Sequence, residues 1–322
     1  MQDVVGHVPA ADVPPDLCLA PVRKRAELVK PMGVVPLIDR ERRARHRLGT
    51  TQAGDPGLFA GEQAREGFDL AVLFPNSFES ALQVFLAGAR RRVGYARDGR
   101  SLLLTTAVPV AHVGHERYYY LELLRRAGLI ESVPVVSEIR FDGVEEARER
   151  GQQLFRSRGI DRPVIGVSPG AAYGTAKRWL PERFAEAAGQ VAKELGAGVA
   201  IFGSKDEREL CEEVAGAIDV AVKNFAGETT LAEFIELAAA CSAYLSNDSG
   251  AMHIASALGI PTVAVFGATD DATTGPTGRL SRVVREAVEC SPCLKRECPI
   301  DHRCMTRVAA SRVAEAALEL LK

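Results

Sequence analysis

Residues 247–267, NDSGAMHIASALGIPTVAVFG, place four small or polar residues in front of a helix-like run that leads into a strand-like one. Short polar residues are favoured at helix starts, where the first backbone N–H groups have no partner within the helix. The apolar run TVAVFG has the length of a buried strand. The stretch therefore predicts a loop, a helix and a strand of an α/β domain.

The same alternation runs through the second half of the chain. The expected elements are a strand at 163–168, a helix from Pro181, a strand at 198–203, a helix from Asp206, a helix at 231–241 and a strand at 243–246. Buried strands separated by helices imply right-handed crossovers and a parallel sheet that is covered on both faces. This half is predicted to be a Rossmann-like domain.

The first half is less regular. It predicts a strand at 68–74, a helix at 76–89, a strand at 91–95 and a helix at 117–128 that its Gly ends. The region from 1 to about 66 lacks this alternation. We place the boundary in PVVSEIRFDG, within 134–143, which gives an N-terminal domain at 1–140 and a C-terminal domain at 141–322. The fold class predicted is α/β with two domains.

Composition narrows the class of protein. A chain of 322 residues with 47% hydrophobic content is long enough for two domains. It has no apolar run of the length that a membrane span needs, and no visible secretory signal, so we expect a cytoplasmic protein. Lys plus Arg (40) nearly balance Asp plus Glu (42), which argues against a nucleic-acid partner.

Three strand-to-helix junctions of the second half carry unusual residues: SPGAAYGTAKRW, FAGETTL and SNDSGAMH. In open parallel sheets, ligands bind beyond the carboxyl ends of the strands, where helix N-termini present unpaired N–H groups. We therefore expect the three junctions to form one nucleotide pocket.

In the stretch quoted first, Asn247 precedes Asp248 and Ser249, either of which could cap the helix. Gly250 would let a ligand approach the backbone, and the free N–H groups suit a phosphate. His253 lies one turn further on, where it could donate to the same anion. The alternative is a good helix start with no ligand.

The stretch SPGAAYGTAKRW is not a Walker loop, because the spacing of that motif is absent. Gly170 and Thr175 belong to a loop able to cradle a diphosphate, and Lys177 would supply charge as the leaving group develops it. The alternative is a basic solvated turn. In AGETTL, Glu228 could accept from a ribose hydroxyl, and Thr229 or Thr230 could cap the next helix.

In the first half, PNSFES puts Asn76 and Ser77 at a helix start after a buried strand. The nearby arginines are Arg90, Arg91, Arg92, Arg97 and Arg100. An anionic acceptor that faces the nucleotide domain would explain both features. A solvated, charged face would explain the arginines equally well.

Four of the seven cysteines lie within the Cys-rich loop, residues 290–304. They are Cys290, Cys293, Cys298 and Cys304, in the spacing C-x2-C-x4-C-x5-C. Four thiolates on a short loop can hold a tetrahedral zinc ion, and His302 could replace one of them. Free thiols and disulfides remain alternatives.

In this order and spacing, the motifs resemble those of a known family, the ADP-heptose:lipopolysaccharide heptosyltransferases, which are family 9 glycosyltransferases with the GT-B fold. The stretches that carry the resemblance are LFPNSFESAL, RRVGY, PGAAYGTAKRW, NFAGETTLAEFIELAAAC and NDSGAMHIASALGIPTVAVFG. The resemblance implies two Rossmann-like domains that face a central cleft.

It also implies inverting transfer of L-glycero-D-manno-heptose from ADP-heptose to the heptose already on the inner core of lipopolysaccharide. The acceptor site would lie in the N-terminal domain, where Asn76 and Ser77 fall, and the donor site in the C-terminal domain. The residues that inherit donor contacts by position are Lys177, Asp248, Ser249, Gly250 and His253. Lys177 would act in catalysis by holding the departing diphosphate.

The catalytic base of the family is an Asp in a Gly-Asp loop that follows a first strand. The chain begins MQDVVGHVPA, which resembles that loop with Gln2 in place of Gly and Asp3 as the carboxylate. The first strand would then be missing from the N-terminal domain. Two rival hypotheses stay open: a related sugar transferase, and a nucleotide-sugar binding protein without turnover.

The resemblance has two further consequences. The family's transfer needs no catalytic metal, so a zinc ion on the Cys-rich loop would be structural. The acceptor is linked to lipid A, so we expect peripheral contact with the inner face of the inner membrane.

Overall fold

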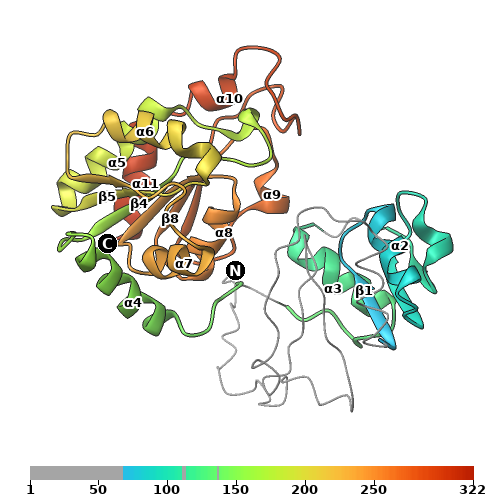
Figure 1. Cartoon of the computed structure of the whole chain (residues 1–322). Helices are drawn as coiled ribbons and strands as arrows, with labels where there is room; N and C mark the ends of the chain where they lie inside the picture. The colour runs from blue at the N-terminus through green and yellow to red at the C-terminus, as the bar shows by residue number, and fades with distance from the viewer. Residues whose placement is uncertain (1–67, 111–113, 136–137) are drawn as a thin grey trace, which may run out of the picture. The chain divides into compact units, whose positions relative to one another are not determined.

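The computed structural model describes residues 68–110, 114–135 and 138–322, which belong to two compact units (Figure 1). Unit 2 begins at Pro134, the first residue of the predicted boundary stretch 134–143, and also takes in Gly114–Glu116. The backbone N–H of Ile139 donates to Thr277 Oγ1 (2.9 Å), and Glu138 pairs with Arg279 (2.7 Å). The chain leading out of unit 1 is thus attached to unit 2.

Unit 2 contains a six-stranded sheet in which every pair is parallel, in the order β6-β5-β4-β7-β8-β9. Its strands are β4 (Val164–Ser168), β5 (Gly198–Ile201), β6 (Val222–Asn224), β7 (Ala243–Asn247), β8 (Thr262–Phe266) and β9 (Ser281–Arg285). The parallel sheet predicted for this half is confirmed.

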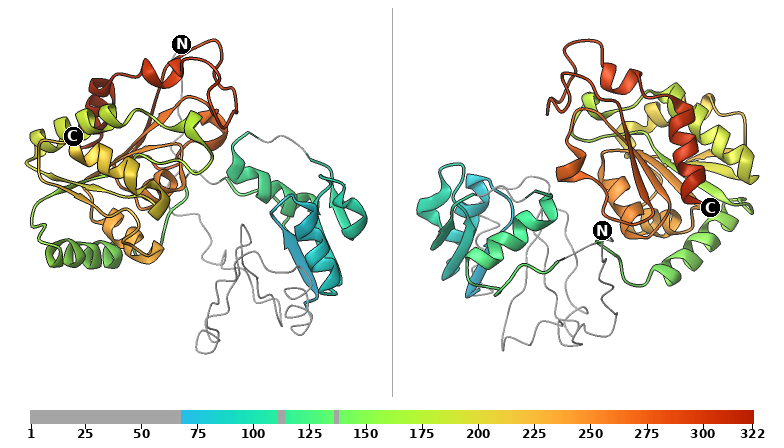
Figure 2. Two further views of the ribbon diagram at one scale, coloured as in Figure 1. Left: turned by 45° about the horizontal axis from the view of Figure 1, so that its top comes forward. Right: turned by 180° about the vertical axis from the view of Figure 1, so that it is seen from behind.

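Helices cover both faces of this sheet. They are α4 (Val144–Ser157), α5 (Pro181–Leu195), α6 (Arg208–Gly216), α7 (Leu231–Ala239), α8 (Gly250–Ala257), α9 (Asp271–Thr274), α10 (Arg303–Thr306) and α11 (Ala310–Leu320). Helices α5, α6 and α11 pack on one face, and α4, α7 and α8 pack on the other (Figures 1 and 2). Two short 3-10 turns, η3 (Thr175–Lys177) and η4 (Lys205–Glu207), precede α5 and α6.

Most side chains of the strands belong to one of two large hydrophobic clusters. Ile165 and Val167 belong to the cluster beneath α5 and α11, whereas Val164 belongs to the cluster that contains Tyr244 and Phe202. This is the period of two that a strand imposes. It explains why the central strands are mostly apolar, because both of their faces are buried.

Unit 1 carries a three-stranded parallel sheet in the order β1-β2-β3. Its elements are β1 (Leu70–Leu73), α2 (Phe78–Leu86), β2 (Arg91–Tyr95), η2 (Arg100–Leu103), β3 (Thr106–Val108) and α3 (Glu116–Arg126). The predicted strand at 91–95 is confirmed, and Gly128 (φ 68°) follows α3 as expected. No helix in the described ranges is long and apolar enough to cross a membrane.

Candidate active site

The site is built where the strand order of unit 2 reverses. From β4, the chain runs through β5 and β6 to one edge of the sheet, then returns beside β4 with β7 and continues to β9. Ser168, at the end of β4, lies opposite Ser246 in β7. The loops after these two strands therefore emerge side by side, which is where open α/β sheets bind ligands.

Lys177 and Asp248 connect these two loops. Lys177 Nζ lies 2.6 Å from Asp248 Oδ2, and the two side chains are 13% and 5% exposed. Thr269 Oγ1 donates to the same carboxylate oxygen at 2.6 Å from the loop after β8. The sequence reasoning missed Thr269, although it follows a strand at the same end of the sheet. Side chains from three loops thus meet at one carboxylate, that of Asp248.

The Asn247 side chain links the loop after β7 to the loop after β4 through hydrogen bonds. Its Oδ1 accepts from the backbone N–H of Trp179 (2.9 Å), and its Nδ2 donates to the carbonyl oxygens of Pro169 (2.7 Å) and Gly170 (3.4 Å). The residue is fully buried. Asn247 was predicted to contact a ligand, but its amide is occupied by the protein, so its role here is to join the two loops.

Helix α8 begins at the centre of the site, and its start differs from the prediction. Ser249 occupies the N-cap position, yet no side chain caps the helix. Ser249 Oγ is 3.0 Å from Ser246 Oγ, and Asp248 is engaged by Lys177. Capping is therefore not what the polar residues do, and the N–H groups from Gly250 onward face the site with the positive end of the helix dipole.

His253 stands one turn into α8, at the surface of the site. Its pKa is lowered, first by protein atoms that displace water around the ring, against the opposing effect of Asp248. His115 and Lys177 lower the pKa further. At neutral pH the imidazole is therefore uncharged, and an anion beside it would favour the protonated form.

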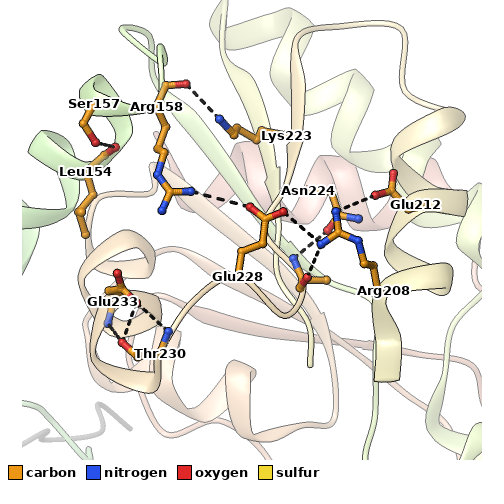
Figure 3. Close-up of polar contacts among 11 residues, drawn as sticks. Leu154, Ser157, Arg158, Arg208, Glu212, Lys223, Asn224, Glu228, Thr230 and Glu233 are labelled. Atoms are coloured by element: carbon orange, nitrogen blue, oxygen red, sulfur yellow. Dashed lines mark hydrogen bonds and ion pairs between the residues drawn. The ribbon is translucent and has the colours of Figure 1, made fainter. Parts of the chain in front are cut away.

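The third junction, after β6, is organised by two arginines (Figure 3). Glu228 lies 3.1 Å from Arg208 Nη1 and 3.8 Å from Arg158 Nη1. Thr230 caps α7 in a capping box with Glu233, which confirms one of the two capping residues that the sequence offered. Thr229 precedes the cap and is half-buried.

Gly170 and Thr175 occupy different parts of the loop after β4. Gly170 is buried, and a Cβ there would lie 2.0 Å from Glu207 Oε1, so a larger residue at this position would displace the Glu207 carboxylate. Thr175 begins η3 and is exposed. The structure therefore places Gly170 in the frame of the loop and Thr175 on its surface.

In unit 1, a buried arginine holds the loop that carries Asn76 and Ser77. Arg100 has no exposed surface and donates to Asn76 Oδ1 (3.2 Å) and to the carbonyl oxygen of Pro75. Asn76 Nδ2 donates to Tyr119 Oη (3.0 Å), and Ser77 caps α2 by accepting from the N–H of Ser80 (3.2 Å). Neither hypothesis for the arginines described Arg100, which is neither solvated nor at the surface.

The other arginines of this group lie outside the core. Arg90 pairs with Asp69 at the surface (2.6 Å), and Arg97 lies 3.9 Å from Asp98. Arg92 donates to the carbonyl oxygen of Leu103, and Arg91 is exposed. These contacts fit the solvated alternative better than a single anion site.

The Cys-rich loop does not form a metal site in the described structure. Its cysteines are all free, and no group of three or more His, Cys, Asp or Glu side chains in the described ranges is arranged to hold an ion. Cys304 is buried in α10 with a raised pKa of about 11, caused first by desolvation, whereas Cys290 is exposed. Asp3, the predicted base, lies outside the described residues.

The sequence of the chain is similar to that of known proteins. The family model Glycosyltransferase family 9 (heptosyltransferase) matches residues 60–303. Lipopolysaccharide heptosyltransferase 2 of Escherichia coli K12 is 33% identical over 249 residues, which cover 74% of this chain and 70% of that one. Lipooligosaccharide heptosyltransferase 2 of Haemophilus influenzae Rd is 30% identical over 240 residues, with 70% and 68% covered.

The solved structures agree with these sequences. The structure of E. coli ADP-heptose LPS heptosyltransferase II matches with a TM-score of 0.69 and 29% identity, over 83% of this chain and 80% of that one. The predicted two-domain α/β fold of the GT-B class is confirmed, as is the resemblance of the motifs to the heptosyltransferase family. The chain belongs to glycosyltransferase family 9, the heptosyltransferases.

Proposed function

We propose that the protein transfers L-glycero-D-manno-heptose from ADP-heptose, with inversion, to the inner-core heptose of lipopolysaccharide. The observation that carries the proposal is the pairing of Lys177 with Asp248 at the uncapped start of α8, in a chain of family 9. A half-buried ammonium group and free helix N–H groups are the features that bind a diphosphate.

The chemistry is a single displacement at the anomeric carbon of the heptose. The acceptor hydroxyl forms the new C–O bond from the face opposite the diphosphate, and the bond to the diphosphate breaks, leaving its electron pair on the phosphate oxygen. Lys177 and the N–H groups of α8 stabilise the charge that grows there, and this preorganised stabilisation is the main contribution of unit 2 to the rate. Ser249 and Gly250, at the start of α8, would also lie beside the diphosphate.

The hydroxyl proton needs a base, and we assign that role to Asp3 on the resemblance of MQDV to the family's base loop. A carboxylate can take the proton only within hydrogen-bond reach of it. Replacing Asp3 by Asn should abolish turnover and leave donor binding intact. Unchanged turnover would remove Asp3 from the mechanism.

We further propose that Glu228 and Thr229 contact the ADP moiety beyond the diphosphate. Glu228 is held by two arginines at the carboxyl end of β6, two strands from β4, so the nucleoside would extend across β5. Its carboxylate can accept from ribose hydroxyls. Replacing Glu228 by Gln should weaken ADP binding more than it weakens the binding of inorganic diphosphate.

The acceptor would bind to unit 1, at the loop that Arg100 stabilises. Asn76 and Ser77 are the residues proposed to contact it. The acceptor is linked to lipid A, so we propose a cytoplasmic protein with peripheral contact with the inner face of the inner membrane. We propose that transfer needs no metal. A structural zinc ion on the Cys-rich loop remains a hypothesis that metal analysis of the purified protein would decide.

The test measures donor binding and turnover on one sample, with a lipid A-linked inner-core acceptor. ADP-heptose should bind and turn over, whereas ADP-glucose should do neither at comparable concentration. Binding without turnover would favour a nucleotide-sugar binding protein. Turnover of a different sugar nucleotide would favour a related transferase. EDTA should leave the rate unchanged.

A further inference from the structure

The Cys-rich loop packs against the donor loop, residues 168–179. The backbone N–H of Ala176 donates to the carbonyl oxygen of Arg296 (2.9 Å), and His302 Nε2 lies 3.0 Å from the carbonyl oxygen of Ala176. Tyr173 Oη donates to the carbonyl oxygen of Leu294 (3.0 Å). These contacts join two segments that are more than a hundred residues apart in sequence.

The fit between these two loops is close. A Cβ at Gly174 would lie 2.2 Å from the carbonyl oxygen of Arg296, so only glycine allows the backbones to approach this far. The Cys-rich loop itself has little apolar support. From Cys290 to His302 it contains neither helix nor strand, and Leu294 and Ile300 are 63% and 58% exposed. Its position therefore depends on contacts with its neighbours.

The same loop reaches the other side of the site. The backbone N–H of Leu294 donates to the carbonyl oxygen of Ala268 (2.8 Å), and Ser291 Oγ donates to that of Gly267 (2.6 Å). These residues directly precede Thr269, which bonds to Asp248. The Cys-rich loop thus spans the two loops that hold the Lys177–Asp248 pair.

Tyr173 connects the Cys-rich loop to Lys177, because its hydroxyl bonds to that loop and its ring contacts the ammonium group. Lys177 Nζ lies 4.8 Å from the centroid of the Tyr173 ring, and Arg296 Cζ lies 5.2 Å from the same centroid. A cation within about 6 Å of a ring face is attracted by the quadrupole of the ring. The ring therefore restrains the ammonium group from one side while Asp248 holds it from another.

We infer that the Cys-rich loop is a structural part of the donor site and that Tyr173 is a positioning residue for Lys177. The Cys-rich loop holds the Tyr173 hydroxyl, and the Tyr173 ring holds the ammonium group where the diphosphate must meet it. Arg296 brings a second cation to the same ring. This inference rests on the proposed function, because it concerns how the diphosphate is met.

The first experiment removes the ring. Tyr173→Leu should weaken ADP-heptose binding by about fivefold, the size expected for one partly exposed cation–π contact, and should raise the donor KM as well as lower kcat. Tyr173→Phe keeps the ring and loses the hydrogen bond to Leu294, so it should weaken binding less than Tyr173→Leu does, by about twofold. Phe141→Leu is the matched control, since Phe141 and Tyr173 are both 41% exposed, and it should change neither constant.

A double-mutant cycle of Tyr173 and Lys177 distinguishes a positioning role of Tyr173 from a general loss of folded protein. If Tyr173 acts through Lys177, then Tyr173→Leu should add little to the loss of ADP affinity that Lys177→Met already causes. Fully additive losses would overturn the inference. So would a Tyr173→Leu variant that loses kcat with an unchanged donor KM, which is the result expected from a smaller fraction of folded enzyme.

The second experiment separates the two loops. Gly174→Ala should displace the carbonyl of Arg296, and the loss of donor affinity should match that of Tyr173→Leu. His302→Gln keeps a donor for the carbonyl of Ala176 and should retain affinity. Wild-type affinity in Gly174→Ala would refute the role of the Cys-rich loop. A wild-type protein that bound no ADP-heptose would instead refute the proposed function.

Discussion

Two lysine–aspartate pairs of unit 2 have the same length and different surroundings. Lys177–Asp248 and Lys193–Asp219 both measure 2.6 Å. The side chains of the first pair are 13% and 5% exposed, and those of the second are 58% and 68% exposed. Exposed pairs contribute little because water screens them, whereas a buried pair holds its charges strongly and is costly to break. Burial, and not distance, therefore separates a site from a surface contact.

Activity should show the largest difference between the two pairs. Lys177→Met should lower kcat/KM for ADP-heptose by about a hundredfold to a thousandfold, because it removes a preorganised positive charge from the departing diphosphate. Lys193→Met should stay within about twofold of the wild type, as a surface change does. Steady-state kinetics of both variants would settle this, and equal losses would mean that Lys177 has no special role.

The two aspartates, Asp248 and Asp219, should also differ in how much each contributes to the free energy of unfolding. Asp248→Asn leaves the Lys177 ammonium group half-buried without its counter-charge, and should lower the free energy of unfolding by about 3 kcal/mol. Asp219→Asn breaks an exposed pair and should leave the free energy of unfolding without a measurable change. Urea unfolding followed by circular dichroism gives both values. If Asp248→Asn unfolded with the same free energy as the wild type, the Lys177–Asp248 pair would not be desolvated in solution.

The third member of the inner cluster predicts a smaller effect. Thr269→Val keeps the shape of the side chain and removes the hydroxyl that donates to Asp248 at 2.6 Å. A hydrogen bond to a charged group contributes about 1.5–3 kcal/mol, and the ion pair remains, so we expect a loss of roughly 1.5 kcal/mol in unfolding free energy. A several-fold rise in the donor KM should accompany it. Thr274→Val is the control, since its hydroxyl donates to the carbonyl oxygen of Asp270, four residues earlier (3.3 Å).

The smallest expected effect is a pH dependence of donor binding. It involves His253, whose pKa is lowered by desolvation, raised by Asp248 and lowered by Lys177. Its pKa is lowered in the free protein, and a bound diphosphate would raise it again. Donor binding should therefore take up a fraction of a proton below about pH 6.5, and affinity should rise two- to threefold as the pH falls through this window. Calorimetry in two buffers of different ionisation enthalpy measures the uptake, which His253→Asn should abolish.

The elements that the sequence predicted well are those buried on both faces. Strands β4, β7 and β8 are mostly apolar and buried along their whole length, and their ends were found within a residue or two. The edge strands β6 and β9 escaped prediction, because VKN and SRVVR carry polar residues and are only partly buried. Propensity alone gives such short edge segments little signal.

The site shows a similar division. Polar residues after buried strands pointed to the three loops, and two of these loops do meet at Lys177 and Asp248. The individual roles of Asn247 and Arg100 could not be predicted, because each depends on backbone carbonyl oxygens brought from distant parts of the chain. The contact between the Cys-rich loop and Tyr173 was equally hidden, since it joins residues 121 positions apart.

The attachment of residues 138–141 to unit 2 has a practical consequence. Besides Glu138 and Ile139, Phe141 is fastened there, through a backbone N–H that donates to the carbonyl oxygen of Ala257 at the end of α8 (3.0 Å). A truncated protein that started at residue 141 would lose the contacts of Glu138 with Arg279 and of Ile139 with Thr277. A shortened form prepared for nucleotide binding should therefore retain the chain from Pro134 onward.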